Sequence, residues 1–102
     1  MKNQAYEITA LGRLDLLQIW NYLAEADSLD AADQVLEDIE KAIERIVEFP
    51  GIGHSRKDLT RRDLLFYTIG SYMIAYRPKH TPLYVIRVLH GSRNIKRLLR
   101  EW

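Results

Sequence analysis

A continuous stripe of apolar residues at helical spacing limits most strongly what this 102-residue chain can fold into. Between positions 32 and 47, apolar side chains recur every three or four residues, as they do along one face of an α-helix. The stripe consists of Ala32, Val35, Leu36, Ile39, Ala42, Ile43, Ile46 and Val47. Most of the charged residues between them are acidic. We therefore expect a helix that packs its apolar face against the rest of the chain and leaves its acidic face in solvent.

A second helix is predicted just before this one, from residue 10 to about residue 24. Its larger apolar residues are Leu14, Leu16, Leu17, Ile19, Trp20, Tyr22 and Leu23. Three of them, Leu14, Leu17 and Tyr22, widen the apolar face, which predicts that the helix is covered on more than one side. Ser28 or Asp30 could cap the following helix. The short connection between the two helices predicts a helical hairpin.

The rest of the chain has the alternating pattern and turn residues of β-strands. The predicted strands span residues 5–9, 64–69, 72–77 and 83–89. Two consecutive tight turns join the last three, which implies an antiparallel meander. A short helix is predicted over residues 95–102, and Thr9 is a suitable N-cap for the first helix. The predicted order is β-α-α-β-β-β-α, an α+β fold in which a helical hairpin packs on an antiparallel sheet.

Length and composition exclude several classes of protein. A chain of 102 residues can build one core but not two, so we expect a single domain over residues 1–102. The absence of cysteine rules out disulfides and thiolate metal sites, and the three histidines lack a paired ligand spacing, so we expect no metal and no cofactor. Neither a signal peptide nor a long apolar span is present. We therefore expect a cytoplasmic protein that does not contact membranes.

The net charge of +1 conceals a division between the two halves of the chain. Residues 1–53 hold four Lys and Arg against eleven Asp and Glu, which gives −7. Residues 54–102 hold eleven Lys and Arg against three acids, which gives +8. Such an asymmetry favours a basic surface for an anionic partner. The alternative is that acidic helices and basic strands form ordinary salt bridges with one another.

The last predicted strand leads into a loop with groups that can bind or cleave phosphodiesters. If the loop binds a phosphodiester, His90 could act as an acid or base on it without a metal, while Arg87 and Arg93 could hold the phosphate. The alternative is structural: His90 would be a polar loop or packing residue, and an inward-pointing Arg87 would donate to loop carbonyls. Tyr72 and Tyr76 share one face of a strand, where core packing is favoured over base stacking.

Four stretches of the sequence together resemble the RelE/ParE superfamily of toxins from type II toxin–antitoxin systems. They are IWNYLA at 19–24, FPGIGHSRKDL at 49–59, GSYMIAYRP at 70–78 and IRVLHGSRN at 86–94. Their order and spacing extend over nearly the whole chain. The long helical hairpin and the final Arg-Val-Leu-His-Gly stretch are most similar to the ParE-like branch. Asn94 departs from the pattern, because an aspartate is expected there.

The resemblance implies a growth-inhibiting toxin that a cognate ParD-like antitoxin holds inactive in a hetero-oligomer. ParE-like toxins poison DNA gyrase without covalent chemistry of their own, whereas RelE-like toxins cut mRNA on the ribosome. Ribonuclease members carry a basic residue early in the strand where this chain has Tyr72 and Met73. We therefore favour a non-catalytic gyrase poison. A ribosome-dependent endoribonuclease and an inactive, repurposed binding module are the alternatives.

Two sets of residues are predicted to form the functional surfaces. The set predicted to contact the target or nucleic acid is Arg56, Lys57, Arg61, Arg62, Arg77, Arg87, His90 and Arg93. Under the ribonuclease alternative, Arg87, His90 and Arg93 would be catalytic. The set predicted to contact the antitoxin, on apolar patches left by the hairpin and the strands, is Trp20, Tyr67, Tyr72 and Tyr76.

Overall fold

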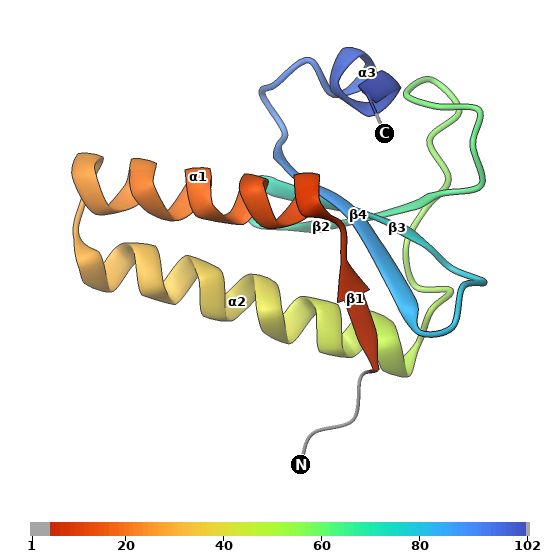
Figure 1. Ribbon diagram of the computed structural model, residues 1–102, viewed down its shortest axis with the longest axis horizontal. Coiled ribbons are helices and arrows are strands. Elements are labelled where there is room, and N and C mark those ends of the chain that lie inside the picture. Colours follow the sequence, from red (N-terminus) through yellow and green to blue (C-terminus); the bar gives the residue numbers. More distant parts are fainter. Residues whose placement is uncertain (1–4, 102) are drawn as a thin grey trace.

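The computed structural model describes residues 5–101 and has three layers (Figure 1). A helical hairpin covers one face of a four-stranded sheet, and a long loop with the C-terminal helical segment covers the other face. This arrangement confirms the predicted α+β fold and element order. The predicted last helix extended to Trp102, which lies outside the described residues. No helix among the described residues is both long enough and apolar enough to span a membrane.

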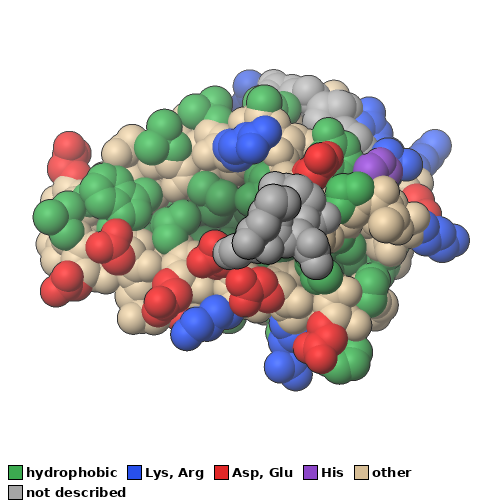
Figure 2. All heavy atoms as spheres, turned by 60° about the horizontal axis from the view of Figure 1, so that its bottom comes forward, with side chains coloured by type: hydrophobic (Ala, Val, Ile, Leu, Met, Phe, Trp, Pro, Cys, Tyr) green, Lys and Arg blue, Asp and Glu red, His purple; other side chains and the backbone are tan. Residues whose placement is uncertain are grey.

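The hairpin consists of α1 (Ala10–Ala26) and α2 (Leu29–Glu48). Ser28 caps α2, because its hydroxyl oxygen accepts a hydrogen bond from the Ala31 amide at 3.0 Å. The apolar stripe of α2 faces the sheet, as predicted, and its exposed face is acidic (Figure 2). The prediction that α1 is covered on more than one side is wrong for the single chain, since Leu14, Leu17 and Tyr22 are 47%, 55% and 69% exposed.

The sheet has the strand order β1-β4-β3-β2. Its strands are β1 (Tyr6–Ile8), β2 (Leu65–Ile69), β3 (Tyr72–Arg77) and β4 (Leu83–His90). The pairs β2–β3 and β3–β4 are antiparallel, which confirms the predicted meander. β1 pairs with β4 in parallel, so the first strand lies beside the last one and the sheet is mixed, whereas an antiparallel sheet was predicted.

β4 is buried on both faces of the sheet and separates two apolar clusters. Val85 and Val88 point to the hairpin side and pack with the buried isoleucines of α2. Ile86 and Leu89 belong to the second cluster, together with Ile95 of α3 (Ile95–Leu98) and residues of the long loop. A 3₁₀ turn over Leu99–Glu101 follows α3. The short C-terminal helix is therefore fixed to the sheet by apolar burial rather than by its own length.

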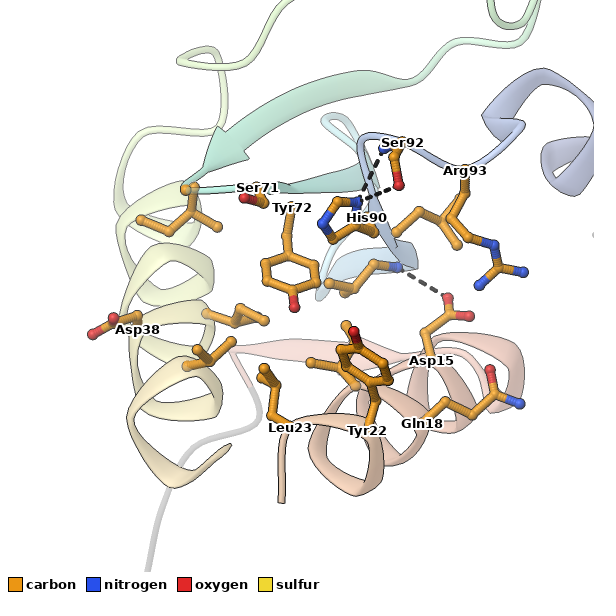
Figure 3. Close-up of a pocket in the computed structure, with 17 residues that line it drawn as sticks. Asp15, Gln18, Tyr22, Leu23, Asp38, Ser71, Tyr72, His90, Ser92 and Arg93 are labelled. Carbon is orange, nitrogen blue, oxygen red and sulfur yellow. Dashed lines mark hydrogen bonds between the residues drawn. The ribbon is translucent and has the colours of Figure 1, made fainter. Parts of the chain in front are cut away.

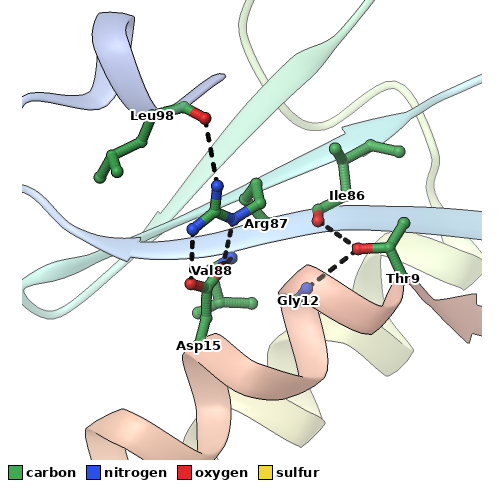
Figure 4. Close-up of polar contacts among 7 residues, drawn as sticks. All are labelled: Thr9, Gly12, Asp15, Ile86, Arg87, Val88 and Leu98. Carbon is green, nitrogen blue, oxygen red and sulfur yellow. Dashed lines mark hydrogen bonds and ion pairs between the residues drawn. The ribbon is translucent and has the colours of Figure 1, made fainter. Parts of the chain in front are cut away.

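The N-terminal part of α1 completes the edge of β4 where β1 ends (Figure 4). The amide of Thr9 donates to the Val85 carbonyl at 3.0 Å, and its hydroxyl donates to the Ile86 carbonyl at 2.6 Å. The same hydroxyl accepts from the Gly12 amide at 2.9 Å and so caps α1. One residue links the end of β1, the start of α1 and the edge of β4.

Gly12 allows this close approach of helix and strand. A Cβ at this position would lie 2.8 Å from the Ile8 Cγ2 atom and 3.2 Å from both the Ile86 carbonyl oxygen and the Thr9 hydroxyl oxygen. Glycine weakens a helix by about 1 kcal/mol relative to alanine. Here that cost is offset by the contacts that the short distance between α1 and β4 permits.

We expect Gly12→Ala to lower the free energy of unfolding by about 1–3 kcal/mol, because the new methyl group displaces α1 from the β4 backbone. Urea denaturation of the purified chain measures the change. Gly51→Ala is the matched control, since nothing lies within 4 Å of the new Cβ and the backbone φ of Gly51 is not positive. Equal stability of Gly12→Ala and the native chain would contradict this explanation of the glycine.

Candidate functional site

Arg87 lies inside the protein and not on the predicted target-binding surface. Its side chain forms a bidentate ion pair with Asp15 of α1, with Nε–Oδ2 at 2.7 Å and Nη2–Oδ1 at 2.8 Å (Figure 4). The third guanidinium nitrogen donates to the Leu98 carbonyl at 3.1 Å. Both members of the pair are about 95% buried. The prediction of Arg87 as a target-binding residue is therefore wrong for this conformation. The structural alternative is correct in that Arg87 points inward, but its partners are a carboxylate and a carbonyl of α3 rather than loop carbonyls.

The carboxylate of Asp15 accepts a hydrogen bond from the backbone of β4 as well as from Arg87. Its Oδ2 atom accepts from the Val88 amide at 3.1 Å, on the edge of β4 that β1 does not reach. A shift in the β3–β4 register places Arg87 opposite Ala75 and Val85 opposite Tyr76, which leaves Ile86 as an extra residue. This bulge orients Arg87 toward α1. A buried carboxylate with three donors is satisfied, whereas one without them would be very costly.

His90 is exposed at the end of β4, and its ring is held by its neighbours. The Ser92 amide donates to its Nδ1 atom at 3.0 Å, and the Ser92 hydroxyl oxygen lies 2.7 Å from the same atom (Figure 3). An amide can only donate, so Nδ1 is the acceptor and the neutral ring carries its proton on Nε2. Tyr72 contacts the ring edge to face, with the centroids 5.3 Å apart.

A groove of about 930 Å³ lies between the hairpin and the sheet, beside His90. We call it the hairpin groove. Its apolar lining comes from α1, α2 and the strands, namely Ile19, Tyr22, Leu23, Val35, Ile39, Ile69, Tyr72, Val88 and Leu89. Tyr22 and Tyr72 point toward one another from α1 and β3 (Figure 3). Burial, and to a smaller degree the nearby Tyr22, raises the pKa of Tyr72 above its ordinary value of 10.0, so its phenol stays neutral.

The residues predicted to bind the antitoxin have different positions in the structure. Tyr72 lines the hairpin groove, and Tyr67 is half-buried against the hairpin-side core. Trp20 is half-buried and donates through Nε1 to Asp33 at 2.8 Å, which ties α1 to α2. Tyr76 is fully buried, so the prediction that it contacts an antitoxin is wrong. The expected core packing of Tyr72 and Tyr76 is confirmed.

Tyr76 instead fixes the loop that follows α2. Its hydroxyl donates to the Pro50 carbonyl at 2.7 Å and accepts from the Gly53 amide at 3.0 Å. Burial raises the pKa of Tyr76, although the hydrogen bond from Gly53 opposes the shift, so the phenol is protonated at neutral pH. A Cβ at Gly53 would lie 2.7 Å from the Tyr76 hydroxyl oxygen. The glycine is therefore needed for this contact.

Most of the predicted basic residues lie on the second face of the sheet. We call residues 54–63 and 93–100 the basic layer, because both segments cover that face (Figure 1). The basic residues of this layer are all exposed; they are Arg56, Lys57, Arg61, Arg62, Arg93, Lys96, Arg97 and Arg100. Arg56 forms a bidentate contact with Asp58, whose pKa is lowered mainly by that hydrogen bond. Arg77 is exposed at the end of β3.

A family model described as the ParE toxin of the type II toxin–antitoxin system parDE matches residues 6–95. The match covers most of the sequence. The chain belongs to the ParE toxin family. This ParE-family chain is therefore the toxin component of a type II toxin–antitoxin system, and an antitoxin is its partner. The resemblance to the ParE-like branch is confirmed.

Individual ParE proteins are similar over most of their length. The chain is 30% identical over 91 residues to Toxin ParE1 of Caulobacter vibrioides, which covers 89% of this chain and 93% of that protein. It is 27% identical over 81 residues to Toxin ParE3 of the same organism, with 79% and 80% covered. The solved structure "Chromosomal ParDE TA system from P. aeruginosa" has the same fold, with a TM-score of 0.72, 15% identity, and 83% of this chain and 92% of that chain covered.

The sequence analysis did not identify two residues that are important in the structure of this ParE-family toxin. Asp15 is a lone carboxylate within the apolar run Leu14–Leu17, and that pattern was the available signal for a buried polar group. Tyr22 was interpreted as a covered residue, although it is exposed at the rim of the hairpin groove. Within residues 5–101, no group of three or more His, Cys, Asp or Glu is arranged to hold a metal ion.

We expect Arg87→Met to lower the free energy of unfolding by about 3–5 kcal/mol, because it leaves the buried carboxylate of Asp15 without its cation. The double variant Asp15→Asn with Arg87→Met should be more stable than Arg87→Met alone. Asparagine removes the charge and keeps an oxygen for the Val88 amide. Urea denaturation gives both values.

Arg61→Met serves as the control for this change, since Arg61 is exposed, and its effect should stay within about 0.5 kcal/mol. A double variant that is less stable than Arg87→Met would show that an uncompensated charge is not the cause of the loss.

Proposed function

We propose that this ParE-family toxin acts without catalysis, by binding DNA gyrase and stabilising its complex with cleaved DNA. The observation that carries the proposal is the buried pair of Asp15 and Arg87. Metal-free RNA cleavage needs an acid, a base and cations that stabilise the charge of the phosphorane. The guanidinium that would supply such a cation already donates to a carboxylate and to the Leu98 carbonyl.

The surroundings of His90 also argue against proton transfer in such a reaction. Its Nδ1 atom accepts from the Ser92 amide, so a single ring nitrogen faces outward for proton transfer. Cleavage of RNA by attack of its 2′-hydroxyl needs both an acid and a base. Burial raises the pKa of the Tyr72 phenol beside His90, so this phenol is a weaker acid and is not ionised to act as a base. These observations favour recognition of a target over cleavage of RNA. Action on gyrase would also locate the chain in the cytoplasm.

The hairpin groove is the site that we propose for the antitoxin. Its floor is apolar and its rim carries the exposed Tyr22, which suits an amphipathic segment of a partner chain. His90 and Arg93 lie at one end of the groove, where they can receive an acidic residue of that segment (Figure 3). Of the four residues first predicted for the antitoxin, Tyr72 is the one that lines this groove.

Expression of the chain without antitoxin in a bacterial host tests the proposed target. We expect protein-linked double-strand breaks in plasmid DNA, while mRNA mapped by primer extension stays intact at early times. His90→Gln should retain growth arrest and DNA breaks, because the proposal gives His90 no proton to transfer. Cut mRNA without breaks would overturn the proposal in favour of a ribonuclease. Normal growth would identify an inactive module.

Binding of a cognate ParD-like antitoxin tests the groove. Tyr22→Ala should weaken the complex by about tenfold to a hundredfold, as expected for an exposed aromatic residue that becomes buried in an interface. Phe49→Ala is the matched control, because Phe49 is 52% exposed and does not line the groove. Isothermal titration calorimetry gives both affinities. Equal affinities of the two variants would place the antitoxin elsewhere.

A further inference from the structure

The basic layer brings together two segments that are separated by 30 positions in the sequence, from Asp63 to Arg93. Leu59 of the first segment and Leu98 of the second pack against the same buried cluster on the second face of the sheet. The two segments are also close electrostatically, since Lys96 contributes to the lowered pKa of Asp58 after the larger effect of Arg56. Cations from both segments therefore form one surface.

The charges of this surface are available to a partner. Arg61, Lys96 and Arg97 are exposed, and within the described part of the chain none of them forms an ion pair. Asp58 and Asp63 are the only acids between residues 54 and 100, and Asp58 is occupied by Arg56. The hairpin on the opposite side of the sheet exposes mainly acids (Figure 2). An anionic partner is thus attracted to one face and repelled from the other.

The surroundings of these cations indicate which kind of polyanion fits. Protein interfaces have an apolar centre with depleted charge, but the large exposed apolar residues, Leu14, Leu17, Tyr22, Leu29 and Phe49, all lie outside the basic layer. Single-stranded nucleic acids bind to aromatic side chains on which bases stack, and residues 54–63 and 93–100 contain no Phe, Tyr or Trp. Binding to the phosphates of a nucleic-acid backbone, by contrast, requires only cationic side chains.

We propose that the basic layer binds the phosphate backbone of duplex DNA without sequence preference. The inference rests on the proposed gyrase function for its biological setting, in which the toxin contacts the DNA segment that gyrase holds as well as the enzyme. The contact is electrostatic, so it fixes the toxin on the gyrase–DNA complex and adds no chemistry.

Fluorescence anisotropy with a labelled 30-base-pair duplex and the purified full chain tests the proposal. The test variant carries Arg61→Gln, Lys96→Gln and Arg97→Gln. The control carries Arg13→Gln, Lys41→Gln and Arg45→Gln on the hairpin, with the same change in composition and net charge. Three lost phosphate contacts should reduce the slope of log K against log salt by about 2.7 and weaken binding at 50 mM salt about tenfold or more. The control should retain the native slope.

Three outcomes would overturn the inference: no binding of the native chain at 50 mM salt, equal weakening by both variants, or displacement of the duplex by equal charge concentrations of poly-glutamate. Tighter binding of a single-stranded 30-mer would overturn the choice of duplex. The gyrase assay separates this inference from the proposed function. Gyrase-dependent breaks without duplex binding contradict only the DNA contact, whereas duplex binding without breaks contradicts only the gyrase function.

The same variants give a second readout in cells. The basic-layer variant should lose growth arrest and keep its affinity for the antitoxin, because none of its three changed residues lines the hairpin groove. The hairpin variant should keep growth arrest. A basic-layer variant that no longer binds the antitoxin would show that the two surfaces are not separate.

Discussion

The buried ion pair between Asp15 and Arg87 connects three parts of the fold that the chain order keeps apart. Asp15 belongs to α1, Arg87 to β4, and the Leu98 carbonyl that Arg87 also contacts belongs to the C-terminal helix. β1 covers the edge of β4 only as far as Val85, and Asp15 accepts the Val88 amide beyond that point. Asp15 therefore satisfies the free edge of β4, and Arg87 holds the C-terminal segment against the sheet.

Both proposed binding surfaces depend on this connection. Asp15 itself lines the hairpin groove, so the position of α1 relative to β4 sets the width of the groove. The Leu98 contact fixes the helix that carries Lys96 and Arg97, which belong to the basic layer. The two proposed binding surfaces need such a link, because the sheet alone does not determine where its flanking segments lie.

The sequence determines the elements of this fold better than their connections. Periodicity predicted both helices, the meander and the C-terminal helix within a few residues, since each depends on local patterns. The parallel pairing of β1 with β4 depends on contacts about 77 residues apart, which no local pattern encodes. Tyr76 illustrates the same limit, because alternation places it on a strand face but does not show that the loop after α2 covers that face.

The site was less predictable than the fold, because an arginine can either bind a target or stabilise the interior of the fold. A Val-Ile-Arg-Val-Leu-His strand delivers the same side chains whether its arginine binds phosphate or an internal carboxylate. What decides between these roles is the register shift at Ile86 together with an aspartate 72 positions upstream. The exposed cations Arg61, Lys96 and Arg97 are different, since none of them forms an ion pair within the described part of the chain. The loop residues predicted for the target surface are exposed in the structure, and their contact with a target stays a prediction; they are Arg56, Lys57, Arg61 and Arg62.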